Sequence, residues 1–108
     1  MRVAAVMSDL MLFSRIDAAA DAAGASLIRV DSPADLPQHL DLVLVDWSAR
    51  EPGWTGELSG IAPARLILFG RHTDLEGHAA ARSGGIGPMW ARSKLVSELP
   101  ELFPSQRT

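Results

Sequence analysis

Acidic residues that follow apolar runs are the residues of this chain best suited to chemistry. Residues 42–45 form a continuous run of branched apolar side chains that ends on Asp46. A second apolar run, residues 3–7, is followed by Ser8 and Asp9. Two carboxylates at the mouth of a site can hold Mg²⁺, which prefers hard oxygen ligands. One of the two can then accept a phosphoryl group, because an aspartate can act as a nucleophile.

Three polar residues, Arg71, His72 and Thr73, form a second group of candidates after the apolar run at residues 65–69. They precede a predicted helix, and the free amide groups and dipole of a helix N-terminus favour anions. This segment is therefore a candidate phosphate or carboxylate site, with a solvated turn as the simpler interpretation.

Two further candidates, Trp90 and Arg92, lie near the end of the last apolar segment. Arg92 is interpreted either as an anion ligand or as the partner of Asp9 or Asp46 in a structural ion pair. Trp90 is interpreted either as a core residue or as part of an apolar patch that contacts a partner.

Five apolar segments predict the strands that must position these side chains. A continuous apolar run bounded by polar residues is typical of a strand buried on both faces of a parallel sheet. The predicted strands cover residues 3–7, 26–30, 42–46, 65–69 and 86–91.

Helical segments alternate with these strands. Ser8 or Asp9 is predicted to cap a helix from Leu10, and Ser32 a short helix that has proline at its first position. A capping box over residues 73–76 opens another helix, and Ser93 is predicted to cap the last, which Pro100 kinks or restarts. Residues 48–63 are rich in glycine and proline and predict a loop with one helical turn at 57–59.

This alternation predicts an α/β fold: a five-stranded parallel sheet, doubly wound and flavodoxin-like, with helices on both faces. We expect a single domain over residues 1–104 and a tail at 105–108. In the flavodoxin-like strand order the first and third strands are neighbours, so Asp9 and Asp46 should approach each other.

Composition excludes several classes of function. The chain has 108 residues, a net charge of -3 and no cysteine, which rules out disulfides, thiolate metal sites and cysteine nucleophiles. No clustered basic face for nucleic acid is visible. No apolar run approaches the roughly 20 residues of a membrane span, and the apolar stretch near the N-terminus is too short for a signal peptide. We therefore expect a cytoplasmic protein with no nucleic-acid or membrane partner.

At its strand ends the chain resembles the receiver domains of bacterial two-component response regulators. Residues 5–9 are similar to the end of their first strand, and residues 45–47 to the end of their third. The resemblance implies a receiver-like fold, a phospho-acceptor at Asp46, and Mg²⁺ bound near it. It also implies that partners commonly dock on the faces of the fourth and fifth helices, and we interpret Trp90 and its surroundings as a candidate for such contact.

Several positions depart from the receiver pattern. Receivers place two acids directly after the first strand, where this chain has Met7 and Ser8, with Asp9 one step later. They place Ser or Thr at the end of the fourth strand, where this chain has Gly70. They place Lys then Pro after the fifth strand, where this chain has Arg92 and then no proline. Arginine is not equivalent to lysine, so the exchange changes the site.

The sequence therefore predicts a divergent receiver, or pseudo-receiver. The leading hypothesis is a stand-alone signalling or protein-interaction module that is not an enzyme, needs no cofactor and is not phosphorylated in the standard way. Its partner is expected to be another protein, with a homodimer left open. One alternative is an active receiver with Asp46 as acceptor and Mg²⁺ at Asp9 and Asp46, with Ser8 assisting. The other is a binder of small anions at the strand carboxyl ends, through residues 70–73.

Overall fold

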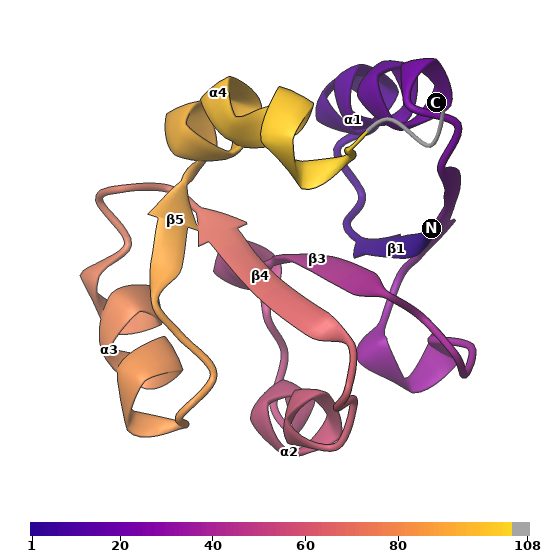
Figure 1. The fold of residues 1–108 in the computed structure, drawn as a ribbon. Coiled ribbons are helices and arrows are strands. Elements are labelled where there is room, and N and C mark those ends of the chain that lie inside the picture. Colours follow the sequence, from indigo (N-terminus) through magenta and orange to yellow (C-terminus); the bar gives the residue numbers. More distant parts are fainter. Residues whose placement is uncertain (105–108) are drawn as a thin grey trace.

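Five parallel strands form one sheet in the order β2-β1-β3-β4-β5, which is the flavodoxin-like order. The computed structural model describes residues 1–104 (Figure 1), and the predicted tail at 105–108 lies outside the described residues. The elements are β1 (Arg2–Val6), α1 (Leu10–Ala22), β2 (Ser26–Val30), η1 (Pro33–Asp35), β3 (Leu42–Asp46), η2 (Trp47–Ala49), α2 (Trp54–Ser59), β4 (Arg65–Gly70), α3 (Leu75–Ser83), β5 (Met89–Ala91) and α4 (Arg92–Leu102). The predicted fold class is confirmed.

Helices cover both faces of the sheet (Figure 1). Successive side chains of a strand point to opposite faces, so each apolar strand supplies two cores. Leu42 and Leu44 of β3 pack with α1 and α4, whereas Val43 and Val45 pack with α2 and α3. Asp46 continues the register of Leu42 and Leu44 and therefore lies on the side of the sheet that carries α1 and α4.

The central strand β3 is buried along its whole length. It lies between β1 and β4, and both neighbours run parallel to it. Edge strand β2 is more polar and more exposed, which fits its position at the end of the sheet. No helix within the described residues is long and apolar enough to cross a membrane.

Two of the predicted helix starts are confirmed and two are wrong. Asp9 caps α1, and Ser32 caps η1. Asp74, not Thr73, caps α3, because its carboxylate reaches the Gly77 amide. Ser93 lies inside α4, which begins directly after β5 without a side-chain cap. The same helix continues through Pro100 to Leu102 instead of restarting there.

The segment after β3 is more helical than predicted. Instead of one turn at 57–59 it contains η2 and then α2, which begins at Trp54. Trp54 and Leu58 are one helical turn apart and both are buried against the sheet, so packing outweighs the local glycine and proline content. β5 is shorter than predicted because Pro88 has no N–H to donate to the sheet.

Candidate functional site

The carboxyl end of the sheet brings Asp9, Asp46 and Arg92 together, and we call these three residues the acid–arginine cluster. Val6 of β1 is paired with Val45 of β3, so the residues that follow both strands emerge side by side. Arg92, the first residue of α4, contacts both acids. Its Nη1 donates to Asp9 Oδ2 at 3.4 Å, and its Nη2 donates to Asp46 Oδ2 at 3.3 Å. The predicted approach of the two acids and the ion-pair interpretation of Arg92 are both observed.

Asp46 is the buried member of the cluster, with 4% of its surface exposed. Burial raises the pKa of its carboxyl above the ordinary value, and the negative charge of Asp9 acts in the same direction. Arg92 and the Ser48 backbone N–H lower that pKa but do not outweigh burial. Part of the cost of burying this charge therefore remains uncompensated.

The hydrogen bonds within the cluster are long, and two of its buried polar atoms have no hydrogen-bond partner in the described part of the chain. Charge-assisted N–H···O bonds are usually about 2.7–2.9 Å long, and both Arg92 contacts exceed that range. Within residues 1–104, Asp46 Oδ1 and Arg92 Nε are buried without a hydrogen-bond partner. The arrangement is therefore held by charge more than by tight hydrogen bonds.

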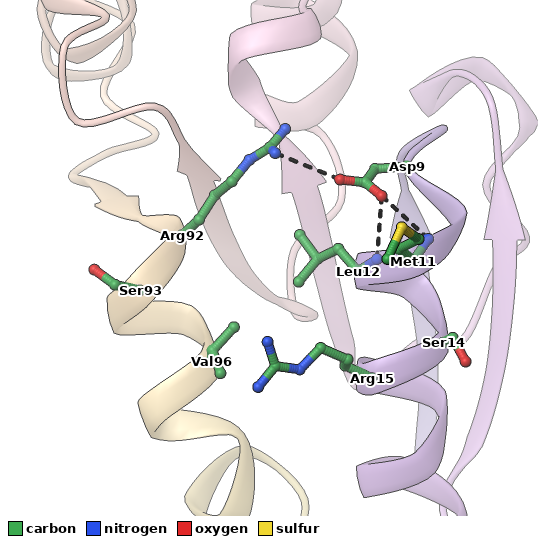
Figure 2. A pocket seen from close by; sticks show the side chains of 8 residues that line it. All are labelled: Asp9, Met11, Leu12, Ser14, Arg15, Arg92, Ser93 and Val96. Carbon is green, nitrogen blue, oxygen red and sulfur yellow. Dashed lines mark hydrogen bonds and ion pairs between the residues drawn. The ribbon is translucent and has the colours of Figure 1, made fainter.

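Asp9 uses both of its carboxylate oxygens. Oδ1 accepts from the backbone N–H groups of Met11 and Leu12, each at 3.1 Å, and so caps α1. Oδ2 accepts from Arg92, as Figure 2 shows. Asp9 is therefore both the predicted N-cap of α1 and a residue of the predicted site.

The donor set of the cluster does not fit a divalent metal. Residues 1–104 contain no group of three or more His, Cys, Asp or Glu side chains placed to hold a metal ion. Of the four carboxylate oxygens of Asp9 and Asp46, only Asp46 Oδ1 has no partner. A guanidinium, which is always charged, already lies against both acids. With Arg92 in this position, a Mg²⁺ ion between them would face cation repulsion.

The turn that holds Arg71, His72 and Thr73 is exposed and lies at the start of α3. An acceptor already occupies that helix N-terminus, because Asp74 Oδ1 accepts from Gly77 N at 2.9 Å. This bond is the main cause of the lowered pKa of the Asp74 carboxyl. One amide donor of the anion site predicted here is therefore already used by a side chain of the protein itself.

Asp74 also anchors the segment that follows β3. Its Oδ2 accepts from Arg50 Nη1 at 3.0 Å and from Ser48 Oγ at 3.0 Å. Sequence reasoning missed this network. The only local signal was an acid directly before the apolar Leu75, and nothing in the sequence indicated that residues 24 and 26 positions away would meet it.

Ser48 lies where a side chain at position 70 would lie. A Cβ on Gly70 would collide with Ser48 Oγ and would approach the Met89 sulfur to 3.0 Å. Ser48 Oγ also accepts from Arg71 N at 2.9 Å. A hydroxyl thus stands beside the end of β4, where receivers carry Ser or Thr, but it comes from a different strand end.

The three tryptophans have different environments. Trp47 is fully buried, and its Nε1 donates to the Gly77 carbonyl at 2.9 Å. Trp54 is also a core residue. Trp90 is only partly buried, and the Lys94 ammonium lies 4.9 Å from its ring centre. Trp90 therefore remains the tryptophan with surface to offer a partner.

No protein-family model matches the sequence, and no curated protein matches it. Among solved structures, the fold is similar to that of a fusion carrying amino acids 181–211 of the yeast Spc42 trimeric coiled coil. The superposition has a TM-score of 0.69 and covers 94% of this chain and 74% of that chain, with 13% sequence identity. A coiled coil contains no sheet, so the similarity lies in the part fused to it. At this identity the similarity shows the fold alone.

Proposed function

We propose that this chain is a receiver-like module for signalling or protein interaction, in which Arg92 takes the place of a divalent metal between Asp9 and Asp46. The observation that carries the proposal is the position of the Arg92 guanidinium, within 3.4 Å of one acid and 3.3 Å of the other. Its fixed charge holds the two strand ends in one arrangement without metal. Standard phosphorylation is then not part of the mechanism.

The burial of Asp46 supports the same proposal. A phospho-acceptor must meet a phosphoryl donor in water, and its carboxylate must be free to attack. Asp46 is 4% exposed, and one of its oxygens is held by Arg92. The module therefore works through its surface, and its partner is another protein or a second copy of the chain.

The test is a titration with Mg²⁺ and beryllofluoride, a phosphoryl mimic, followed by tryptophan fluorescence. Trp47 adjoins Asp46 and is buried, so it reports events at that carboxylate. We expect no saturable change in the unaltered protein. A saturable change that disappears in Asp46→Asn would refute the proposal and identify an active receiver. A fluorescence response to inorganic phosphate that persists in Asp46→Asn would instead favour a protein that binds small anions.

Partner contact is proposed at the half-buried Trp90, beside Lys94 at the start of α4. We expect Trp90→Ala to weaken binding to a partner, or self-association measured by analytical ultracentrifugation, without loss of the fold. The matched control is Leu75→Ala, which removes an exposed apolar side chain, 76% accessible, on α3.

A further inference from the structure

An open cleft of about 750 Å³ lies between α1 and α4, on the face of the sheet that carries Asp46. Its lining is mainly apolar, with Leu12 and Met11 from α1 and Val96 from α4. Figure 2 shows Arg15 reaching from α1 toward Val96, with Arg92 and Asp9 at one end of the cleft. Its volume lies within the range of about 300–1,000 Å³ typical of small-molecule sites.

One cation of this cleft, Arg15, has no hydrogen-bond or ion-pair partner in the described part of the chain. The acid in the lining is Asp9, and its two oxygens are engaged by the α1 amides and by Arg92. An unpaired guanidinium beside an apolar wall is complementary to an oxyanion that carries an apolar body.

Met11 adds to this complementarity. Its side chain lines the cleft and is 84% exposed, so it offers apolar surface that a ligand can cover. Methionine is flexible and polarizable and adapts to apolar ligands of different shapes. A ligand lying along Met11 would remove its apolar surface from water.

We propose that this cleft binds a small amphipathic molecule whose oxyanion head, a carboxylate or a phosphate, pairs with Arg15 while its apolar body lies between Met11, Leu12 and Val96. The oxyanion head of the ligand lies at the Arg15 end of the cleft, because the Asp9 carboxylate at the opposite end repels it. The proposed head-group position at Arg15 differs from the Mg²⁺ position that the receiver resemblance implies, although Asp9 borders both.

The cleft is also linked to the acid–arginine cluster, and this link rests on the proposed function. Arg92 lines the cleft and contacts Asp46 at the same time. Its contacts with the two acids are long, and its Nε has no partner within residues 1–104. Arg92 borders the space that the ligand fills, so ligand binding displaces its guanidinium from Asp46 and changes the end of β3.

The site is tested by isothermal titration calorimetry with octanoate, octyl phosphate and the neutral 1-octanol, below their aggregation concentrations. We expect saturable binding of octanoate, octyl phosphate or both, and the tighter of the two identifies the head group. Arg15→Ala should weaken that binding by about tenfold or more, the usual effect of losing a charge-assisted hydrogen bond. The matched control is Arg82→Ala, an exposed arginine on α3 at the opposite face, which should leave binding unchanged.

Absence of binding by both anions would overturn the proposal, as would equal binding of 1-octanol or equal loss in Arg82→Ala. The link to Asp46 is tested separately by two-dimensional ¹H–¹⁵N NMR. We expect octanoate to shift the Arg92 Nε–H and the Asp46 amide signals. Shifts in α1 and α4 that leave the Asp46 amide signal unchanged would leave a ligand site but refute its link to the cluster, independently of the beryllofluoride result.

Discussion

Replacing Arg92 by alanine isolates the energetics of the acid–arginine cluster. Arg92→Ala removes the cation that lies 3.3 Å from the buried Asp46 and 3.4 Å from the more exposed Asp9. Asp46 must then keep an unpaired charge at 4% exposure or take up a proton. Either response lowers the stability of the folded state at neutral pH.

The expected loss is about 1–3 kcal/mol at pH 7. A hydrogen bond to a charged group contributes about 1.5–3 kcal/mol. The Arg92 side chain is 43% exposed and its contacts are long, so solvent screening places the Asp46 contribution at the lower end of that range. The Asp9 contact adds at most about 1 kcal/mol, the usual limit for a surface pair.

The pH dependence follows from the raised pKa of Asp46. A raised pKa means that the folded state binds the proton more tightly than the unfolded state, whose value is near 3.8. The stability from that proton is present below pH 3.8 and is lost as the pH rises through the folded-state pKa. Arg92 is the main influence that lowers this pKa, so Arg92→Ala raises it further. The difference between variant and unaltered protein should therefore be small near pH 3 and grow toward pH 7.

The assay is urea denaturation at several pH values between 3 and 7, monitored by circular dichroism. The matched control is Arg71→Ala, because Arg71 is an exposed arginine near the same end of the sheet and its side chain makes no hydrogen bond or ion pair with the described residues. It should change stability by less than about 0.5 kcal/mol. A loss in Arg92→Ala that does not vary with pH, or one no larger than that of Arg71→Ala, would show that Arg92 does not stabilise the charge of Asp46.

Three other substitutions give predictions that urea denaturation can check. Asp46→Asn should raise the free energy of unfolding at pH 7, because burial disfavours the charge that it removes; a loss above about 1 kcal/mol would contradict this. Asp74→Ala should cost about 1–2 kcal/mol above pH 4 by removing the α3 cap and the Arg50 ion pair. Because the pKa of Asp74 is lowered, that cost should shrink as the pH falls below 3.8, and Asp74→Asn, which keeps a capping side chain, should cost less. Gly70→Ala should cost about 1–3 kcal/mol through its collision with Ser48, and less in a Ser48→Gly background; equal costs in both backgrounds would show that Ser48 is not the obstacle.

The strands were predictable because helices cover both faces of the sheet, so the side chains on both faces are apolar. β3 and β4 are buried on both sides and appear in the sequence as continuous apolar runs. Alternation of strands with helical segments then gave the fold class and placed Asp9 near Asp46. The start of α1 was also predictable, because an N-cap depends only on residues close in sequence.

Features that depend on tertiary contacts were not predictable. α2 forms because Trp54 and Leu58 pack against the sheet. Local helix propensity does not predict this packing. α4 starts at Arg92 because β5 ends immediately before it, so the expected cap at Ser93 falls inside the helix. The cleft between α1 and α4 depends on the distance between two helices, which sequence patterns do not give.

The contrast between two aspartates at the same end of the sheet argues that Asp46 has a role beyond stability. Both of the Asp74 carboxylate oxygens have partners, and its pKa is lowered, so the charged side chain stabilises the fold. Asp46 makes no side-chain cap to η2, leaves Oδ1 without a partner in the described chain and has a raised pKa. An asparagine in its place would avoid the cost of the buried charge. A buried acid with a raised pKa is typical of a functional position, where a residue that suits the site replaces the one that would suit stability. By this reasoning we assign Asp74 to the scaffold and propose that Asp46 and Arg92 belong to the functional site.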